Sequence, residues 1–267
     1  MKSIFKTLIA LTTISLLCQN CSIVPFTGRK QLSIVPESEM IAMGIASYQE
    51  FLKTNPPSRD NNNANIVVEV GTKISNAIDS YFAASNLETK LDGYKWEYTL
   101  VESAVPNAFC LPGGKIVIYS GILPYTADKN GLAVVISHEI AHAVARHGGE
   151  RMSQQLLLQL GGVALSEAVK NKPEETKGIY NTVYGIGGQL GIMLPYSREH
   201  ELEADKLGLI FMALAGYNPE SAVGFWERMS ASGGNKPPEF MSTHPSDTRR
   251  ISKIKAAMPE AMKYYKK

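Results

Sequence analysis

The chain has 267 residues, of which 44% are hydrophobic and 19% are charged, a composition typical of a folded globular protein rather than of a disordered one. Its formal net charge is +2, and the first twenty residues hold the excess as Lys2 and Lys6. The neutral remainder argues against a nucleic-acid-binding surface and against an electrostatic membrane patch.

The N-terminus has the pattern of a lipoprotein signal peptide over residues 1–20. Two lysines precede an apolar run at residues 7–17, which is too short to span a bilayer comfortably, and cysteines follow. We expect Cys21 to carry the lipid, with Cys18 as the alternative; a plain secretory signal or an uncleaved anchor would also give this pattern. If Cys21 is lipidated, Cys110 is the one thiol left in the mature chain, and an intrachain disulfide is excluded.

Residues 21–36 are expected to form a lipidated linker and residues 37–267 a single domain. Apolar residues at helical spacing predict helices, and alternating ones predict strands. Two more helices are expected within the glycine-rich segment 153–195, and whether residues 161–191 cover the site is left open. The other expected helices are 37–52, 65–82, 132–151, 197–215, 219–230 and one from near Ser246, and the main strands are 95–103 and 115–119. The fold class is therefore α+β, mostly helical, with a small sheet before a long helix.

That long helix carries the stretch "ISHEIAHAVARHGGE". His138 and His142 are four residues apart and share one helix face, so their imidazoles can bind one metal ion. Glu139 directly follows the first histidine and can reach water at such a metal, as the general base of a zincin does. The flanking positions are apolar, which predicts a buried helix. A chance pair of core histidines is the alternative explanation.

His147 lies five residues beyond His142, roughly 140° further round a continuous helix. It is therefore expected off the metal-binding face, where it and Arg146 would form the polar C-terminal end favoured by the helix dipole.

A third metal ligand is expected from "SREHELEADKLGL". Glu201 is the predicted ligand, and Asp205, four residues later on the same face, is placed to fix the orientation of a ligand histidine. Ala204 and Gly208 would let this helix lie close to the histidine helix. Glu203 is expected on the solvent side. The alternative for these acids is an ordinary solvated helix face.

Several blocks of the chain resemble metallopeptidase family 48, the gluzincin family of the HtpX and CAAX prenyl protease type. The blocks occur in the family's order, and the start after Cys21 is similar to the periplasmic lipoprotein members of the BepA and LoiP type. The chain lacks the transmembrane helices of the HtpX type and the long helical-repeat extension of the BepA type. The matching blocks are "CSIVPFTGRKQL", "NAFCLPGGKIVIYSGIL", "HEIAHAVARH", "YSREHELEADKLG" and "STHPSDTRRI".

The resemblance implies a zincin-like domain that binds one zinc ion and hydrolyses peptide bonds, with Glu139 moving the proton. His244 and Arg249 are candidate oxyanion donors, and His244 could instead cap the metal in a resting form. The strand 115–119 could pair with the substrate backbone as an edge strand. Cys110 is expected to be a buried, small apolar residue rather than a nucleophile.

The sequence therefore predicts a zinc-dependent endopeptidase that cleaves misfolded or misassembled envelope proteins. It is expected to be lipid-anchored in a bacterial cell envelope and to face the periplasm, with Ser22 after Cys21 favouring the outer membrane. The alternatives are a chaperone-like or binding lipoprotein that holds zinc but cleaves little, and a purely structural lipoprotein. An intact Glu139 argues against the binding lipoprotein, because such a protein has no need of a catalytic base. The separate third ligand on a later helix argues against the purely structural lipoprotein, which would not need it.

Overall fold

The computed structural model describes residues 21–160, 198–231, 239–244 and 249–266. Helices dominate, and a small sheet precedes helix α5, so the predicted α+β class is confirmed. In chain order the elements are β1 (Cys21–Ile23), β2 (Lys30–Leu32), α2 (Glu37–Thr54), α3 (Asn61–Ala84), η1 (Glu88–Leu91), β3 (Glu97–Val101), β4 (Ala108–Leu111), β5 (Lys115–Tyr119), η2 (Ser120–Ile122), α4 (Leu123–Thr126), α5 (Lys129–Val144), α6 (His147–Leu160), α9 (Arg198–Leu214), α10 (Ser221–Ala231), α11 (Glu239–Thr243) and α12 (Arg250–Ala261).

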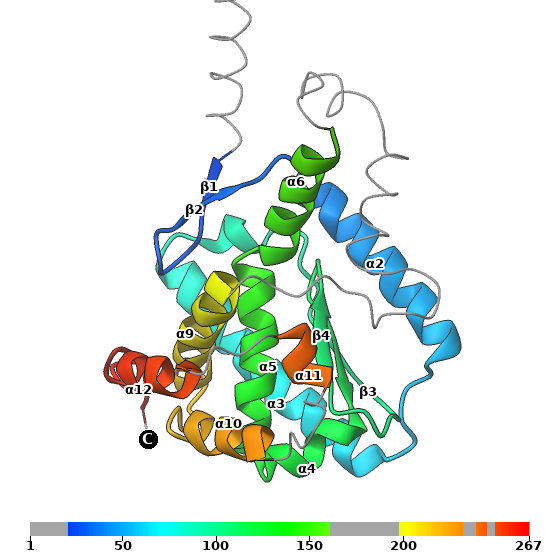
Figure 1. Ribbon diagram of the computed structural model, residues 1–267, viewed down its shortest axis with the longest axis vertical. Helices are drawn as coiled ribbons and strands as arrows, with labels where there is room; N and C mark the ends of the chain where they lie inside the picture. Colours follow the sequence, from blue (N-terminus) through cyan, green and yellow to red (C-terminus); the bar gives the residue numbers. More distant parts are fainter. Residues whose placement is uncertain (1–20, 161–197, 232–238, 245–248, 267) are drawn as a thin grey trace, which may run out of the picture.

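Helix α5 runs through the middle of the molecule, with α3, α9 and β4 packed around it (Figure 1). It begins after Asp128, whose carboxylate accepts a hydrogen bond from the N–H of Gly131 at 2.8 Å and so caps the helix. Every residue from Gly131 to Val144 is buried, as the apolar pattern predicts. Polar side chains on this helix must therefore find their partners inside the protein.

The main sheet has the strand order β3-β5-β4, with β5 parallel to β3 and antiparallel to β4. A turn at Gly113 and Gly114 joins β4 to β5, and both glycines have positive φ angles, of 85° and 81°, which other residues rarely adopt. Strand β5 is central, so the prediction that Lys115–Tyr119 is an edge strand is wrong. The strand at the edge of the sheet that packs against α5 is β4.

The predicted single helix over residues 132–151 is two helices. Helix α5 ends at Val144, Arg146 adopts a left-handed backbone with φ of 56°, and α6 begins at His147. The change in direction puts His147 in a different place from the one that a continuous helix predicts.

Residues 21–36, predicted as a linker, contain a two-stranded hairpin of β1 and β2. Val24 in this segment is completely buried in the core. The ring of Phe26 stacks on Tyr81 of α3 at 4.9 Å and meets Phe211 of α9 edge-on at 5.5 Å. The hairpin is thereby fixed on two helices of the domain.

The other predicted helices and strands that lie within the described residues are confirmed, most of them with shifted ends. The segment 161–191, which holds most of the stretch with the two further expected helices, and the predicted start of the last helix near Ser246 lie outside the described residues. A short helix, α11, lies in a stretch predicted as loop. Among the helices that the structure describes, none is both long enough and apolar enough to cross a membrane.

Candidate metal centre

Helices α5 and α9 make a close contact at Gly208. A Cβ atom there would lie 3.2 Å from the backbone nitrogen of His138 and 3.3 Å from its Cα, so a larger residue would push the helices apart. Ala204, one turn earlier, is completely buried. The predicted small-residue stripe is confirmed, and it brings the acidic side chains of α9 to the histidines of α5.

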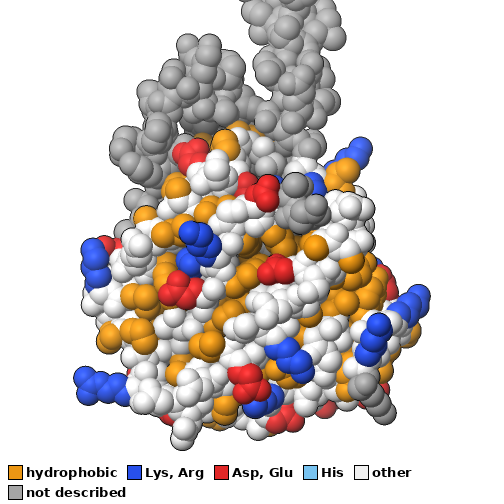
Figure 2. Space-filling model, turned by 180° about the vertical axis from the view of Figure 1, so that it is seen from behind, with side chains coloured by type: hydrophobic (Ala, Val, Ile, Leu, Met, Phe, Trp, Pro, Cys, Tyr) orange, Lys and Arg blue, Asp and Glu red, His pale blue; other side chains and the backbone are white. Residues whose placement is uncertain are grey.

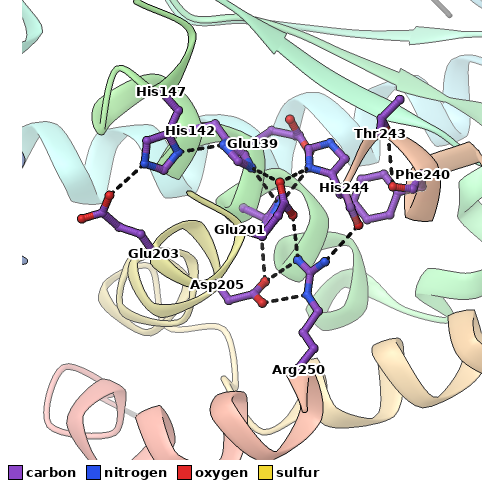
Figure 3. A network of polar contacts seen from close by, with 11 residues as sticks. Glu139, His142, His147, Glu201, Glu203, Asp205, Phe240, Thr243, His244 and Arg250 are labelled. Atoms are coloured by element: carbon purple, nitrogen blue, oxygen red, sulfur yellow. Dashed lines mark hydrogen bonds and ion pairs between the residues drawn. The ribbon is translucent and has the colours of Figure 1, made fainter. Parts of the chain in front are cut away.

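Three side chains from these two helices meet at one spot, and Figure 3 shows two of them, His142 and Glu201. The Nε2 atoms of His138 and His142 lie 3.0 Å apart. Glu201 places Oε2 at 3.3 Å from Nε2 of His138 and Oε1 at 3.3 Å from Nε2 of His142. All three residues are at most 2% exposed. The structure therefore brings together the three ligands that the sequence predicts.

His244, which follows α11, adds a third nitrogen and a fourth candidate ligand atom. Its Nδ1 lies 3.1 Å from Oε1 of Glu201 and 3.3 Å from Nε2 of His138. Together the four ligand atoms lie within 4.8 Å of one another. Of its two predicted roles, this position fits the metal cap better than the oxyanion donor.

The spacing of these atoms fits a tetrahedral metal ion. Bonds of about 2.0–2.1 Å from zinc to nitrogen or oxygen place neighbouring ligand atoms about 3.3–3.4 Å apart. The separations given above run from 3.0 to 3.3 Å. Imidazole nitrogens with one carboxylate are also a donor set that suits zinc.

Asp205 supports the first ligand. Its Oδ1 lies 3.0 Å from Nδ1 of His138, the contact that the sequence predicts. Arg250 of α12 holds this carboxylate with two hydrogen bonds of 2.7 Å and lies 3.2 Å from Glu201. Burial alone would raise the pKa of Asp205, but Arg250 and His138 hold it below its usual range.

The structure places Arg250, not Arg249, at the site. Arg249 is exposed at the start of α12, whereas Arg250 is 3% exposed, with its guanidinium 3.5 Å from the ring centre of Trp226. Helical spacing could have predicted that Arg250 is the buried arginine of the pair, because it lies four residues before the buried Ile254 and shares its face of the helix.

Glu139 lies beside the ligand cluster and is 1% exposed. Burial raises the pKa of its carboxyl to about 7, although His244, Arg250 and the backbone N–H of Cys110 oppose the rise. Oε1 of Glu139 is 3.4 Å from Nε2 of His244. A buried carboxyl with a near-neutral pKa is suited to accept a proton and give it back. The thiol of Cys110 is buried as predicted, and burial raises its pKa well above the usual value.

The predictions for His147 and Glu203 are wrong. The ring of His147 is fully buried, because the helix break turns it back toward α9, and its Nδ1 lies 2.8 Å from Nδ1 of His142. Glu203 is 8% exposed, and its Oε2 lies 2.9 Å from Nε2 of His147 (Figure 3). Burial lowers the pKa of His147 to about 4, so the ring is neutral at pH 7.

All five histidines of the chain belong to one buried cluster. The rings of His138 and His142 are 4.6 Å apart, those of His142 and His147 4.9 Å, and those of His147 and His200 4.4 Å, while His244 lies 5.0 Å from His138. The face in Figure 2 accordingly shows scattered charges of both signs among hydrophobic side chains, and none of the described histidines reaches it.

The comparison with known families agrees with this geometry. The family model for Peptidase family M48 matches residues 72–258, which contain α5, α9 and the start of α12. The chain belongs to peptidase family M48. The resemblance seen in the sequence is confirmed, and the family is one of metal-dependent peptidases.

Named relatives come from two groups. The mitochondrial metalloendopeptidase OMA1 of Schizosaccharomyces pombe is 38% identical over 169 residues, covering 62% of the chain and 48% of that protein. Its counterpart in Saccharomyces cerevisiae is 39% identical over 189 residues, covering 66% of the chain and 50% of that protein. The beta-barrel assembly-enhancing protease of Escherichia coli is 28% identical over 161 residues, covering 59% of the chain and 33% of that protein. The match to each yeast relative thus spans about half of that protein's length.

The comparisons overturn the predicted location in a bacterial cell envelope. The relatives with the more extensive matches are named as mitochondrial metalloendopeptidases, in two yeasts, in Arabidopsis thaliana and in Homo sapiens. The prediction of a periplasm-facing protein at the outer membrane is therefore wrong.

Proposed function

We propose that the protein is a zinc-dependent endopeptidase with His138, His142 and Glu201 as metal ligands. The observation that carries the proposal is the convergence of these three side chains, from two helices, at spacings that fit tetrahedral zinc. Membership of the M48 family supports the reaction class.

Glu139 acts as the general base and acid in this proposal. When bound, zinc polarises a carbonyl and lowers the pKa of water. Glu139 takes the proton of the attacking water and passes it to the leaving amine, for which a pKa of about 7 is suited. Arg250 and Asp205 hold Glu201 and His138 in place throughout.

His244 is the fourth ligand of a resting form in this proposal. Its Nδ1 stands with the ligand atoms, and its ring lies against Glu139. Substrate must therefore displace the ring before the base can reach water.

The proposed substrates are polypeptides in an unfolded or misassembled state. A buried site admits only an extended, flexible segment, because a folded surface cannot reach groups that are at most 2% exposed. A binding protein with little activity is the rival, and the position of Glu139 beside the ligands speaks against it, since binding alone needs no base.

Cleavage of unfolded casein tests the proposal. The wild-type protein should cleave it, a chelator should stop cleavage, and added zinc should restore it. Glu139→Gln should bind zinc as the wild type does but lose about 10²–10⁴-fold in rate, because an amide cannot accept the proton. Wild-type cleavage by this variant would remove Glu139 as the base, and absence of zinc from the wild-type protein would refute the metal assignment.

Attachment to a membrane through a lipid on Cys21, with residues 1–20 as its signal, stays a proposal from the sequence. Cys21→Ser should abolish incorporation of a labelled fatty acid, whereas Cys18→Ser should not. Continued labelling of Cys21→Ser would move the lipid to Cys18.

A further inference from the structure

A buried chain of hydrogen bonds leads away from His142 on the side opposite the ligand cluster. Nδ1 of His142 lies 2.8 Å from Nδ1 of His147, and Nε2 of His147 lies 2.9 Å from Oε2 of Glu203. The same Oε2 accepts a hydrogen bond of 2.7 Å from Nε of Arg29, and the hydroxyl of Thr27 donates to Oε1. Thr27 and Arg29 both belong to the N-terminal hairpin. The mechanism proposed above uses none of these four partners.

The direction of each hydrogen bond follows from the role of His142. A histidine that binds metal through Nε2 carries its proton on Nδ1, so His142 donates to Nδ1 of His147. His147 must then be protonated on Nε2, where it donates to the carboxylate of Glu203. Arg29 and Thr27 donate to this carboxylate as well, so each link has one donor and one acceptor.

The two ligand histidines on α5 are supported in parallel ways. Asp205 lies directly behind His138, and Arg250 holds that carboxylate. Behind His142 the carboxylate is Glu203, and the imidazole of His147 lies between them. The inserted ring moves the carboxylate outward, to where an arginine of the hairpin can reach it.

His147 and Arg29 are both fixed from a second side. Arg29 also binds Glu150 of α6, at 3.0 and 2.7 Å, and Glu150 lies 2.9 Å from Nε2 of His200. The ring of His200 stacks on that of His147, with centroids 4.4 Å apart and planes 20° from parallel. The ring of His147 therefore has little freedom to rotate away from His142.

We propose that His147 is the positioning residue for the metal ligand His142, and that the Arg29–Glu203–His147 chain couples the N-terminal hairpin to metal binding. The inference rests on the proposed function, because it takes His142 as a metal ligand. Loss of a partner on the second ring nitrogen of a ligand histidine typically costs about 10–100-fold in metal affinity or activity. Coupling is reciprocal, so zinc must also stabilise the hairpin.

Zinc affinity in the full-length protein tests the first half. His147→Leu removes both hydrogen bonds at similar volume and should raise the zinc dissociation constant about 10–100-fold. His147→Gln keeps a donor and an acceptor and should stay closer to the wild type. His200→Leu is the comparison variant: it removes the ring that stacks on His147 but leaves both hydrogen bonds of His147 in place, so it should weaken zinc binding clearly less than His147→Leu does. Wild-type affinity in His147→Leu would overturn the proposal.

Arg29→Met keeps the test decisive if His147→Leu fails to fold, because Arg29 is 28% exposed and tolerates change better. It should weaken zinc binding in the same direction, whereas Arg29→Lys should recover part of the loss. Unchanged zinc affinity in Arg29→Met would show that the hairpin is not coupled to metal binding.

Hydrogen exchange of residues 24–32, measured with and without zinc, tests the second half without any use of activity. Zinc should slow exchange there in the wild type and have little effect in Arg29→Met. Equal slowing in both proteins would refute the coupling. A wild-type protein that binds no zinc would refute the proposed function itself. If His147→Leu binds zinc with wild-type affinity and cleaves casein at the wild-type rate, only the positioning role is refuted.

Discussion

Two adjacent arginines at the start of α12 lie in opposite environments. Arg250 is buried against Asp205, Glu201 and the indole of Trp226, and Arg249 is exposed. Without Arg250, the carboxylates of Asp205 and Glu201 would remain buried but would lose the positive charge that offsets the cost of burying them.

We therefore expect Arg250→Met to lower the free energy of unfolding by about 3 kcal/mol and to lower zinc affinity. Arg249→Met is the matched control, and it should change stability by less than about 0.5 kcal/mol. Urea unfolding of both variants, with zinc and with chelator, measures this. Equal losses in the two would contradict the placement of Arg250.

His244 gives a second prediction at this scale. If its ring occupies a ligand position at rest, only the fraction of molecules with the ring displaced can bind substrate. His244→Ala should then retain zinc on three ligands and cleave casein about tenfold faster. The adjacent Thr243→Ala is the control for damage to α11. A slower His244→Ala with normal zinc content would instead assign the ring to the oxyanion.

Residues with a short-range signal could be predicted from the sequence. His138, Glu139 and His142 share one helix, and Glu201 and Asp205 share another, so helical spacing alone places them. The environments of His147 and Glu203 could not be predicted. The turn at Arg146 is formed by a residue other than glycine or proline, and Glu203 is covered by the N-terminal hairpin, more than 170 residues away in the sequence.

Among the helices, the contact of α5 with α9 determines where Glu201 lies. Gly208 and Gly224 are both helical glycines at which a Cβ would meet a neighbour at 3.2 Å. At Gly208 the neighbour is the backbone of His138, whereas at Gly224 it is the far end of the Arg228 side chain. The backbone of His138 cannot shift without moving the predicted ligand that it carries, whereas the end of the Arg228 side chain can move aside.

Gly208→Ala should therefore weaken zinc binding and destabilise the protein by about 1–3 kcal/mol, as overpacking does. Gly224→Ala should be neutral or stabilise by up to about 1 kcal/mol, since alanine favours helix. Thermal unfolding and zinc titration of the pair provide the measurement. A stabilised Gly208→Ala with unchanged zinc affinity would show that the helices can separate freely.

Most helices and strands could be predicted from the sequence, but the elements against which they pack could not. The bounds of β5 coincide with the predicted strand 115–119, yet its place at the centre of the sheet depends on parallel pairing with β3, which precedes β4 in the chain. The sequence predicts a linker over residues 21–36, but Val24 is buried in the core, and the ring of Phe26 packs against rings of α3 and α9. Such contacts arise from long-range packing that local periodicity does not record.

At the scale of the whole molecule, Glu150 links the hairpin to the helices and should make stability depend on pH. Burial would raise the pKa of its carboxyl, but hydrogen bonds from His200 and Arg29 lower it from 4.5 to about 2. A depressed carboxyl pKa stabilises the folded state above the unfolded pKa, and the contribution disappears as the pH falls from about 4.5 to about 2.

Glu150→Gln should thus be less stable than the wild type at pH 6, by on the order of 1 kcal/mol, and the difference should vanish near pH 2. Urea unfolding across this pH range tests it. Glu50→Gln, which removes an exposed ion pair with Lys53, is the control and should change little at any pH. A difference that persists at pH 2 would mean that the carboxylate charge is not its source.

The long sequence separations within the metal centre have a consequence during biosynthesis. His138 and His244 are 106 residues apart, and the contact of Arg29 with Glu203 spans 174 residues. A growing chain that has emerged only as far as α6 carries the two histidines and the base, but has no Glu201, Asp205 or Arg250. A nascent chain of that length therefore lacks three of the side chains that form the proposed metal site. The proposed metal site can be complete only after translation has passed residue 250, by which point Glu203 and Phe211, the partners of the N-terminal hairpin on α9, have already been made.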